Sequence, residues 1–143
     1  MIFNLCCLHW TNARYIFKRR KMLAKTMDLI VCISGDEKSW SQGRKLIEKG
    51  EWERILVVLD QQSSKKFSTS KKADHIILDS EKPATELISE LSKHLKEKIQ
   101  SFDVGVNLVA GSGKEHMVIL ASLLRLGVGI RLVALTAKGI VEL

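Results

Sequence analysis

The 143-residue sequence has few cysteines, and their spacing excludes the common metal sites. The three cysteines are Cys6, Cys7 and Cys32, and they form no CxxC pair and no Cys/His ligand pattern. We therefore predict no metal site and no cofactor. An odd cysteine count, with Cys32 inside an apolar run, is typical of the reducing cytoplasm, and we interpret Cys32 as a small buried hydrophobe.

The sequence also lacks a hydrophobic run long enough to cross a membrane. Residues 2–10 form an apolar stretch that is too short for a transmembrane helix. A secretory signal places its basic residues before the apolar stretch, whereas in this sequence the basic cluster follows it. We therefore predict neither a signal peptide nor a membrane span.

Acidic residues are missing from the first 26 positions, which hold six of the 23 lysines and arginines. The formal charge of +7 is therefore concentrated in a basic leader, residues 1–26, and residues 27–143 are nearly neutral. This distribution argues against direct nucleic-acid binding by residues 27–143. Two interpretations of the leader stay open. Either translation begins at Met22 or Met27 instead of Met1, or the leader is an amphipathic basic arm that contacts a partner or a membrane surface.

From residue 27 onward, apolar β-branched runs that predict strands alternate with segments whose apolar residues have helical spacing. The polar residues 61–72 are predicted to form a mobile loop containing a helical turn, and residues 140–143 a short antiparallel strand. This alternation predicts one α/β domain over residues 27–143, with a Rossmann-like, doubly wound, mostly parallel sheet and no second domain. The other expected strands are residues 28–34, 54–60, 75–79, 104–110 and 130–135, and the expected helices are residues 39–50, 80–100 and 117–126.

Two glycines follow the fourth of these strands, in the run Ala110-Gly-Ser-Gly-Lys-Glu-His116. Ligands of doubly wound sheets bind beyond the carboxyl ends of the strands, where helix N-termini favour phosphate. Gly111 and Gly113 would let the backbone approach such a ligand, Lys114 would add a positive charge, and Ser112 a hydroxyl. A phosphate site and a purely structural turn both fit this pattern.

Two well-known phosphate-binding motifs are excluded. A Walker A loop needs a glycine where this sequence has Leu108, and a Ser or Thr where it has Glu115. A dinucleotide-binding fingerprint needs a GxGxxG run, and none surrounds Gly35 after the first predicted strand. The sequence therefore argues against ATP hydrolysis and against a dinucleotide cofactor.

Four other features have both a functional and a structural interpretation. His116 fits a general acid or base, but we favour a surface position at the start of its helix, because the sequence fixes no partner carboxylate. Asp36 fits a hydroxyl or metal contact, and more simply complements a helix dipole. Trp40 fits a base-stacking residue, and more simply packs in the core or a dimer interface. The lysines of residues 65–72 fit a lid over phosphates, and more simply a solvated loop.

The run from Val106 to Met117, an asparagine-containing strand followed by the glycine turn and an apolar helix, resembles the fourth strand and loop of the CRISPR-associated Rossmann-fold (CARF) domains. In that family the turn is similar to Thr-Gly-Gly-Thr-Lys, and a terminal pair of strands closes the Rossmann core. The family's turn becomes Ala110-Gly-Ser-Gly113 in this sequence, so that one hydroxyl is lost and one glycine has moved. CARF domains form homodimers that bind cyclic oligoadenylates in a cleft across the two-fold axis.

The resemblance implies which residues contact the ligand. The turn corresponds to one ligand loop of the family, and residues 34–39 correspond to the loop after its first strand. The apolar helix that follows the turn would then be buried between the sheet and a dimer partner. The winged-helix or nuclease domain usual in the family is expected to be absent. The ligand contacts expected from this correspondence are Ser34, Gly35, Asp36, Ser39, Gly111, Ser112, Gly113 and Lys114.

Three functions are compatible with these observations. The first is a homodimeric, cytoplasmic sensor of CRISPR-linked antiviral defence that binds a cyclic oligoadenylate. The second is a metal-free ring nuclease, in which backbone amides, Ser112 and Lys114 would stabilise the phosphorane as a ribose 2′-hydroxyl attacks. The third is an interaction module that dimerises but has lost its ligand.

Overall fold

The computed structural model describes residues 27–143. The basic leader and the alternative starts at Met1 and Met22 lie outside the described residues. Strands and helices alternate along the described chain, as the apolar pattern predicts. The elements are β1 (Asp28–Ile33), α2 (Glu37–Lys49), β2 (Ile55–Asp60), the 3₁₀ helix η1 (Ser63–Lys65), β3 (Asp74–Leu78), α3 (Ala84–Lys98), β4 (Asp103–Asn107), α4 (Gly113–Leu126), β5 (Gly129–Thr136) and β6 (Gly139–Glu142).

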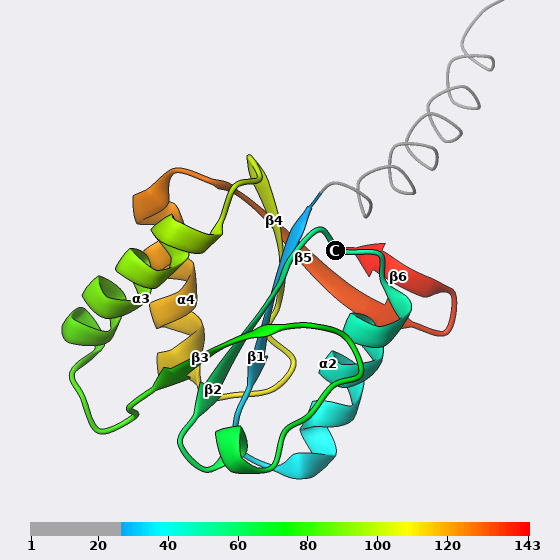
Figure 1. The fold of residues 1–143 in the computed structure, drawn as a ribbon, viewed down its shortest axis with the longest axis horizontal. Coiled ribbons are helices and arrows are strands. Elements are labelled where there is room, and N and C mark those ends of the chain that lie inside the picture. The colour runs from blue at the N-terminus through cyan, green and yellow to red at the C-terminus, as the bar shows by residue number, and fades with distance from the viewer. Residues whose placement is uncertain (1–26) are drawn as a thin grey trace, which may run out of the picture.

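The six strands form one sheet in the order β3-β2-β1-β4-β5-β6. Neighbouring strands from β3 to β5 are parallel, and β6 pairs antiparallel with β5. Helices α3 and α4 lie together on one face of the sheet, and α2 covers the other face (Figure 1). The predicted Rossmann-like, mostly parallel sheet with a C-terminal antiparallel strand is confirmed.

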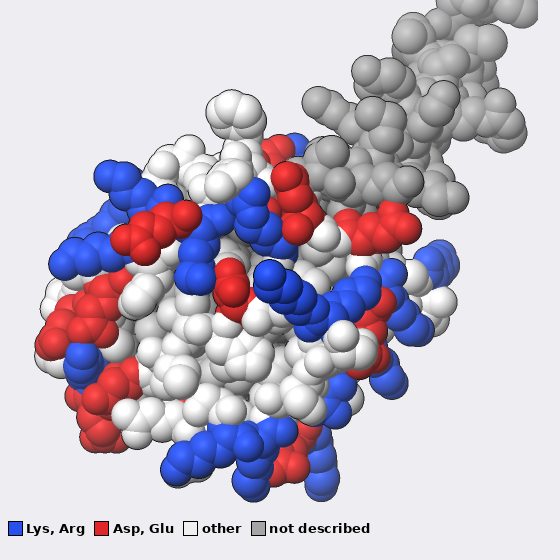
Figure 2. Space-filling model, viewed as in Figure 1, with Lys and Arg blue, Asp and Glu red and all other residues white. Residues whose placement is uncertain are grey.

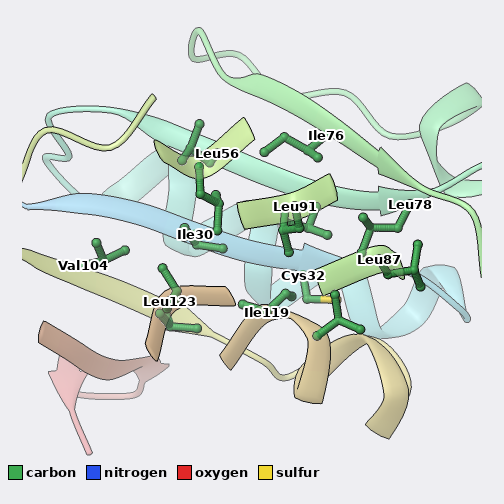
Figure 3. Close-up of a cluster of buried hydrophobic side chains, with 14 residues drawn as sticks. Ile30, Cys32, Leu56, Ile76, Leu78, Leu87, Leu91, Val104, Ile119 and Leu123 are labelled. Carbon is green, nitrogen blue, oxygen red and sulfur yellow. The ribbon is translucent and has the colours of Figure 1, made fainter. Parts of the chain in front are cut away.

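Two apolar layers, one on each face of the sheet, hold the helices in place. On one face, Ile30 of β1 packs with Leu91 of α3 and Ile119 of α4, and all three are fully buried (Figure 3). On the other face, Leu46 of α2 packs against the opposite sides of the same central strands. Central parallel strands are covered on both faces and therefore consist of continuous apolar runs. Cys32 lies in the first layer and is 1% exposed, which confirms its interpretation as a buried hydrophobe.

The structure corrects the element boundaries beside the glycine turn. β4 ends at Asn107, three residues earlier than predicted, and α4 begins at Gly113, four residues earlier than predicted. The helix begins early because Ser112 is its N-cap and Glu115 completes a capping box. Residues 108–112 therefore form the loop, and the charged residues of the motif belong to the first helical turn.

The remaining boundaries follow from local capping and turn chemistry. All strands other than β4 begin and end within one residue of their predicted positions. α3 begins at Ala84 instead of residue 80, after Pro83 at its N-cap. The polar connection between β2 and β3 contains the predicted helical turn, η1, while its mobility stays a prediction. None of the helices within residues 27–143 combines the length and the apolar character needed to cross a membrane.

Candidate functional site

The candidate site lies at the carboxyl ends of β1 and β4, the two central strands of the sheet. The chain leaves β1 toward α2 on one face and leaves β4 toward α4 on the other, so the two connecting loops diverge at this point (Figure 1). Open α/β sheets bind their ligands in the crevice that such a divergence creates. The loops concerned are residues 34–36 and 108–112, which contain the expected ligand residues.

Glu115 joins these two loops. Its Oε2 atom accepts a hydrogen bond from the Ser34 hydroxyl at 2.5 Å and another from the Ser112 N–H at 2.7 Å. The Ser112 hydroxyl in turn accepts from the Glu115 N–H at 3.3 Å, which completes the capping box. Ser34 is 3% exposed and Glu115 is 7% exposed, so the bond between these two side chains is shielded from solvent, whereas Ser112 is exposed. The structure therefore brings Ser34 together with the glycine turn, through a residue that was not among the expected contacts.

The sequence does contain a signal for this role of Glu115. Ser112 and Glu115 are three residues apart and precede an apolar helix, which is the sequence pattern of a capping box. The pattern predicts that the Glu115 side chain turns back to the Ser112 N–H. It does not predict the bond to Ser34, because that contact spans 81 residues of sequence and depends on how α4 docks beside β1.

Gly111 allows the turn to lie directly over β1. Its φ is +106°, a conformation that favours glycine, and an added Cβ would lie 2.6 Å from the Cys32 Sγ. Burial and the neighbouring Glu115 carboxylate raise the pKa of the Cys32 thiol to about 12. The thiol is therefore protonated at neutral pH and packs as an apolar group beneath the turn, without acting as a nucleophile.

Lys114 and His116 connect the glycine turn to nearby backbone carbonyl oxygens. The Lys114 ammonium donates to the carbonyl oxygens of Ser80 at 2.7 Å and Lys82 at 2.6 Å, so its side chain extends toward the connection between β3 and α3. His116 lies near the start of α4, as the surface interpretation expects, but its ring is not fully exposed. The ring is half-buried, with Nε2 2.9 Å from the carbonyl oxygen of Ala110. Both residues therefore fix the position of the turn.

The loop after β1 ends the strand and begins α2. Gly35 has a φ of +76°, which lets the chain turn sharply after Ser34. Asp36 is the N-cap of α2, and its side chain accepts from the Lys38 N–H at 3.4 Å, consistent with the helix-dipole interpretation. The Ser39 hydroxyl donates to the carbonyl oxygen of Asp36 at 2.6 Å. Gly35 and Asp36 stay exposed at the edge of the sheet, and Ser39 is half-buried.

Asp60, at the carboxyl end of β2, holds the next connection. Its carboxylate accepts from the Ser63 N–H at 2.5 Å and, at 3.5 Å, from the Gly35 N–H. Partial burial alone would raise the pKa of Asp60, but hydrogen bonds from the N–H and the hydroxyl of Ser63, and from the Gly35 and Gln62 N–H groups, outweigh it and lower the pKa. Asp60 therefore stays ionised and ties η1 to the loop after β1.

The chemistry available at this edge is that of backbone amides, hydroxyls and scattered charges. On the face drawn in Figure 2, lysines and arginines are interspersed with acidic residues and do not form one broad basic area. Within residues 27–143, no three His, Cys, Asp or Glu side chains gather closely enough to hold a metal ion.

No protein-family model matches this sequence, and a search of curated proteins finds no match.

Proposed function

We propose that this chain binds a nucleotide-type ligand, a cyclic oligoadenylate, at the edge formed by residues 34–39 and 111–114, and acts as a homodimeric sensor in CRISPR-linked defence. The observation that supports the proposal is the link from Ser34 through Glu115 to Ser112. It joins the two loops that the CARF resemblance assigns to the ligand, at the point of the sheet where ligands of this fold class bind.

The first turn of α4 offers the groups that a phosphate needs. The first intrahelical bond runs from the His116 N–H to the Ser112 carbonyl, so the N–H groups of Gly113 and Lys114 precede it. These amides lie at the positive end of the helix dipole, and both residues are exposed. The Glu115 carboxylate lies nearby and opposes an anion. A phosphate would therefore be held by the two exposed amides of Gly113 and Lys114.

The outer surface of α4 supports the homodimer. Met117 is 68% exposed and Leu124 is 70% exposed, and residues seven apart lie on the same side of a helix. Leu132 on the neighbouring β5 is 42% exposed. Exposed apolar side chains on one side of a helix are typical of an interaction surface. A two-fold pair of chains would suit a cyclic ligand that is itself built from repeated units.

A substitution on this surface tests the dimer. Leu124→Lys introduces a charge into the proposed interface, and Ile77→Lys is the matched control, since Ile77 is 55% exposed on the strand at the opposite edge of the sheet. We expect sedimentation velocity to show a dimer for the unmodified chain and for Ile77→Lys, and a monomer for Leu124→Lys. A monomeric unmodified chain would contradict the proposal.

The ligand is tested by thermal shift with cyclic tetra- and hexa-adenylate, because a ligand that binds only the folded state raises the melting temperature. Gly113→Asp adds a negative charge to the proposed site in open space and at a helix position where Asp is favourable, so the variant should fold. Gly113→Ala is its uncharged control. We expect the shift to survive in Gly113→Ala and to disappear in Gly113→Asp. Cleavage of the cyclic ligand to linear products during prolonged incubation would indicate the ring nuclease instead.

One observation favours the interaction module as a second candidate. The Glu115 carboxylate already accepts the Ser34 hydroxyl and the Ser112 N–H, two donors that a bound phosphate could otherwise use. A chain that forms the dimer but shows no thermal shift with any cyclic or linear nucleotide would support this candidate over the sensor.

A further inference from the structure

Strands β5 and β6 are left uncovered on the face of the sheet that carries α3 and α4. Both helices pack in one core layer with the strands from β3 to β4, and Ile130 is the one residue of β5 and β6 that packs against this layer. In Figure 1, β6 lies at the edge of the sheet away from both helices. The apolar face of a sheet is stable when another element covers it, so this part of the sheet lacks a covering layer among residues 27–143.

The face left uncovered carries no charged side chain on β5 or β6. Successive side chains of a strand point to opposite faces of a sheet, so the residues of β5 that share a face with Ile130 are every second one. Their neighbours on β6 follow from the register, in which Ala134 lies opposite Val141. The charged residues of both strands lie on the other face, where the Arg131 guanidinium donates to the Glu142 carboxylate at 3.1 Å. The exposed and half-buried residues of the uncovered face, which we call the apolar strip, are Leu132, Ala134, Val141 and Leu143.

The outer side of α4 is a second apolar surface on the same side of the sheet. The exposed Met117 and Leu124 lie one above the other, and the half-buried Leu120 and Ala121 lie between them, so this side of the helix carries no charge. α4 has 14 residues and is about 21 Å long, and β5 has 8 residues and is about 26 Å long. Two neighbouring strands are about 10 Å wide, which is the diameter of one helix. The apolar strip therefore has the length and width to hold one helix of this size.

We infer that α4 of each chain docks onto the apolar strip of a second copy, across a two-fold axis parallel to the strands. The strip and the outer side of α4 lie beside each other on one face of the sheet, so a single rotation places each helix on the strip of the other chain. Each strip then gains the helix layer that it lacks. The inference rests on the proposed function in taking the chain to be a homodimer, and it adds the surface that α4 contacts.

The two surfaces also match along their length. Only residues 127 and 128 connect α4 to β5, so the C-terminal end of the helix lies level with the start of the strand, and a rotation about an axis parallel to the strands keeps these levels. Leu124 of one chain then meets Leu132 of the other near this end. Met117 lies about 10 Å further along the helix, level with Ala134 and Val141. The same axis places the two candidate sites side by side at one end of the dimer, where one cyclic ligand could contact both.

The area of this contact is close to what a stable dimer needs. Each chain contributes two surfaces, each about 10 Å wide and 21 Å long, so the flat area of the four surfaces is about 800 Å². Side chains project from these surfaces, and the accessible area is therefore larger than the flat area. It approaches the ~1,200 Å² at which stable interfaces begin. The contact buries no charged side chain of either surface, so it carries no penalty for an unpaired buried charge.

The test is sedimentation velocity of full-length variants, alone and mixed in equal amounts. Leu124→Lys and Leu132→Glu each place a charge in both contacts of the dimer, and each alone should weaken the dimer at least tenfold. In their mixture, one contact joins opposite charges and the other keeps two leucines, so the dimer should return. A mixture of Leu124→Lys with Leu132→Lys is the matched control and should stay monomeric, since the new charges are alike. Ile77→Glu, on the opposite edge strand, should leave the dimer unchanged.

Circular dichroism melting of each variant shows whether it folds. Leu143→Glu is a second variant of the strip that should fold, because Leu143 is the last residue and 79% exposed, and it should weaken the dimer several-fold. The inference is overturned if folded Leu132→Glu and Leu143→Glu dimerise like the unmodified chain, or if the mixture of opposite charges stays monomeric.

The outcomes separate this inference from the proposed function. A dimer that Leu124→Lys disrupts and that both strip variants leave intact would keep the homodimer and overturn docking on the strip. A dimer restored in the mixture of opposite charges, with no thermal shift for any nucleotide, would keep the docking and overturn the sensor. A monomeric unmodified chain would overturn both, including the case in which residues 1–26 cover the strip.

Discussion

Replacement of Glu115 by alanine should detach the loop after β1 from the glycine turn. The substitution removes the acceptor of two hydrogen bonds, from the buried Ser34 hydroxyl and from the Ser112 N–H. Hydrogen bonds to a charged group contribute about 1.5–3 kcal/mol each, but water can replace the acceptor at the exposed Ser112. We therefore expect Glu115→Ala to lower the free energy of unfolding by about 2–3 kcal/mol. Glu115→Gln keeps an acceptor and the capping box, and should cost about 1 kcal/mol or less.

A double-mutant cycle isolates the contact between the loops. Urea unfolding of the full chain, followed by circular dichroism, would be measured for Ser34→Ala, Glu115→Ala and the double variant. Because Ser34→Ala and Glu115→Ala remove the same hydrogen bond, the double variant should lose about 1–2 kcal/mol less than the sum of the two single losses. Losses that add to within about 0.5 kcal/mol would refute the reasoning, since they would mean that the loops are not coupled through this bond.

Three further predictions concern the same region. Gly111→Ala should lower the free energy of unfolding, measured by urea denaturation, by about 1–3 kcal/mol, because residue 111 has a positive φ and lies close to the Cys32 sulfur. Gly113→Ala lies in open space within a helix and should change the free energy of unfolding by less than about 1 kcal/mol. The pKa of the Cys32 thiol is about 12 in the folded state against an ordinary value of 9.0, so the free energy of unfolding should fall as the pH rises above about 9. In Cys32→Ala, urea unfolding measured across this pH range should show a smaller fall in the free energy of unfolding. An equal fall would contradict this assignment. Glu115→Gln removes a negative charge while keeping the cap, so calorimetry should show tighter binding of a cyclic oligoadenylate at low salt, and weaker binding would contradict the proposed position of its phosphates.

The strands could be predicted because of how the central ones are buried. β1 and β2 are covered on both faces, and this requires continuous runs of valine, isoleucine and leucine that the sequence displays directly. The end of β4 was harder to predict, because the apolar residues Leu108, Val109 and Ala110 continue its pattern after the chain has left the sheet. Leu108 and Ala110 are apolar because they pack against the two core layers from within the loop, not because they belong to the strand.

The topology predicted at which edge of the sheet the candidate site lies. It did not predict which side chains contact one another there. The carboxyl ends of parallel strands lie at one edge, so residues 34–36 and the glycine turn were expected to be neighbours. The direction of Lys114 depends on how closely the connection between β3 and α3 approaches α4, and a sequence pattern does not encode that distance.

Calorimetric titration of the full chain with cyclic tetra-adenylate tests the central claim most directly. The account predicts saturable binding of one ring per two chains, retained in Gly113→Ala and lost in Gly113→Asp. A folded, dimeric chain that gives no heat with the cyclic ligand, or one that binds it equally well in Gly113→Asp, would contradict the claim.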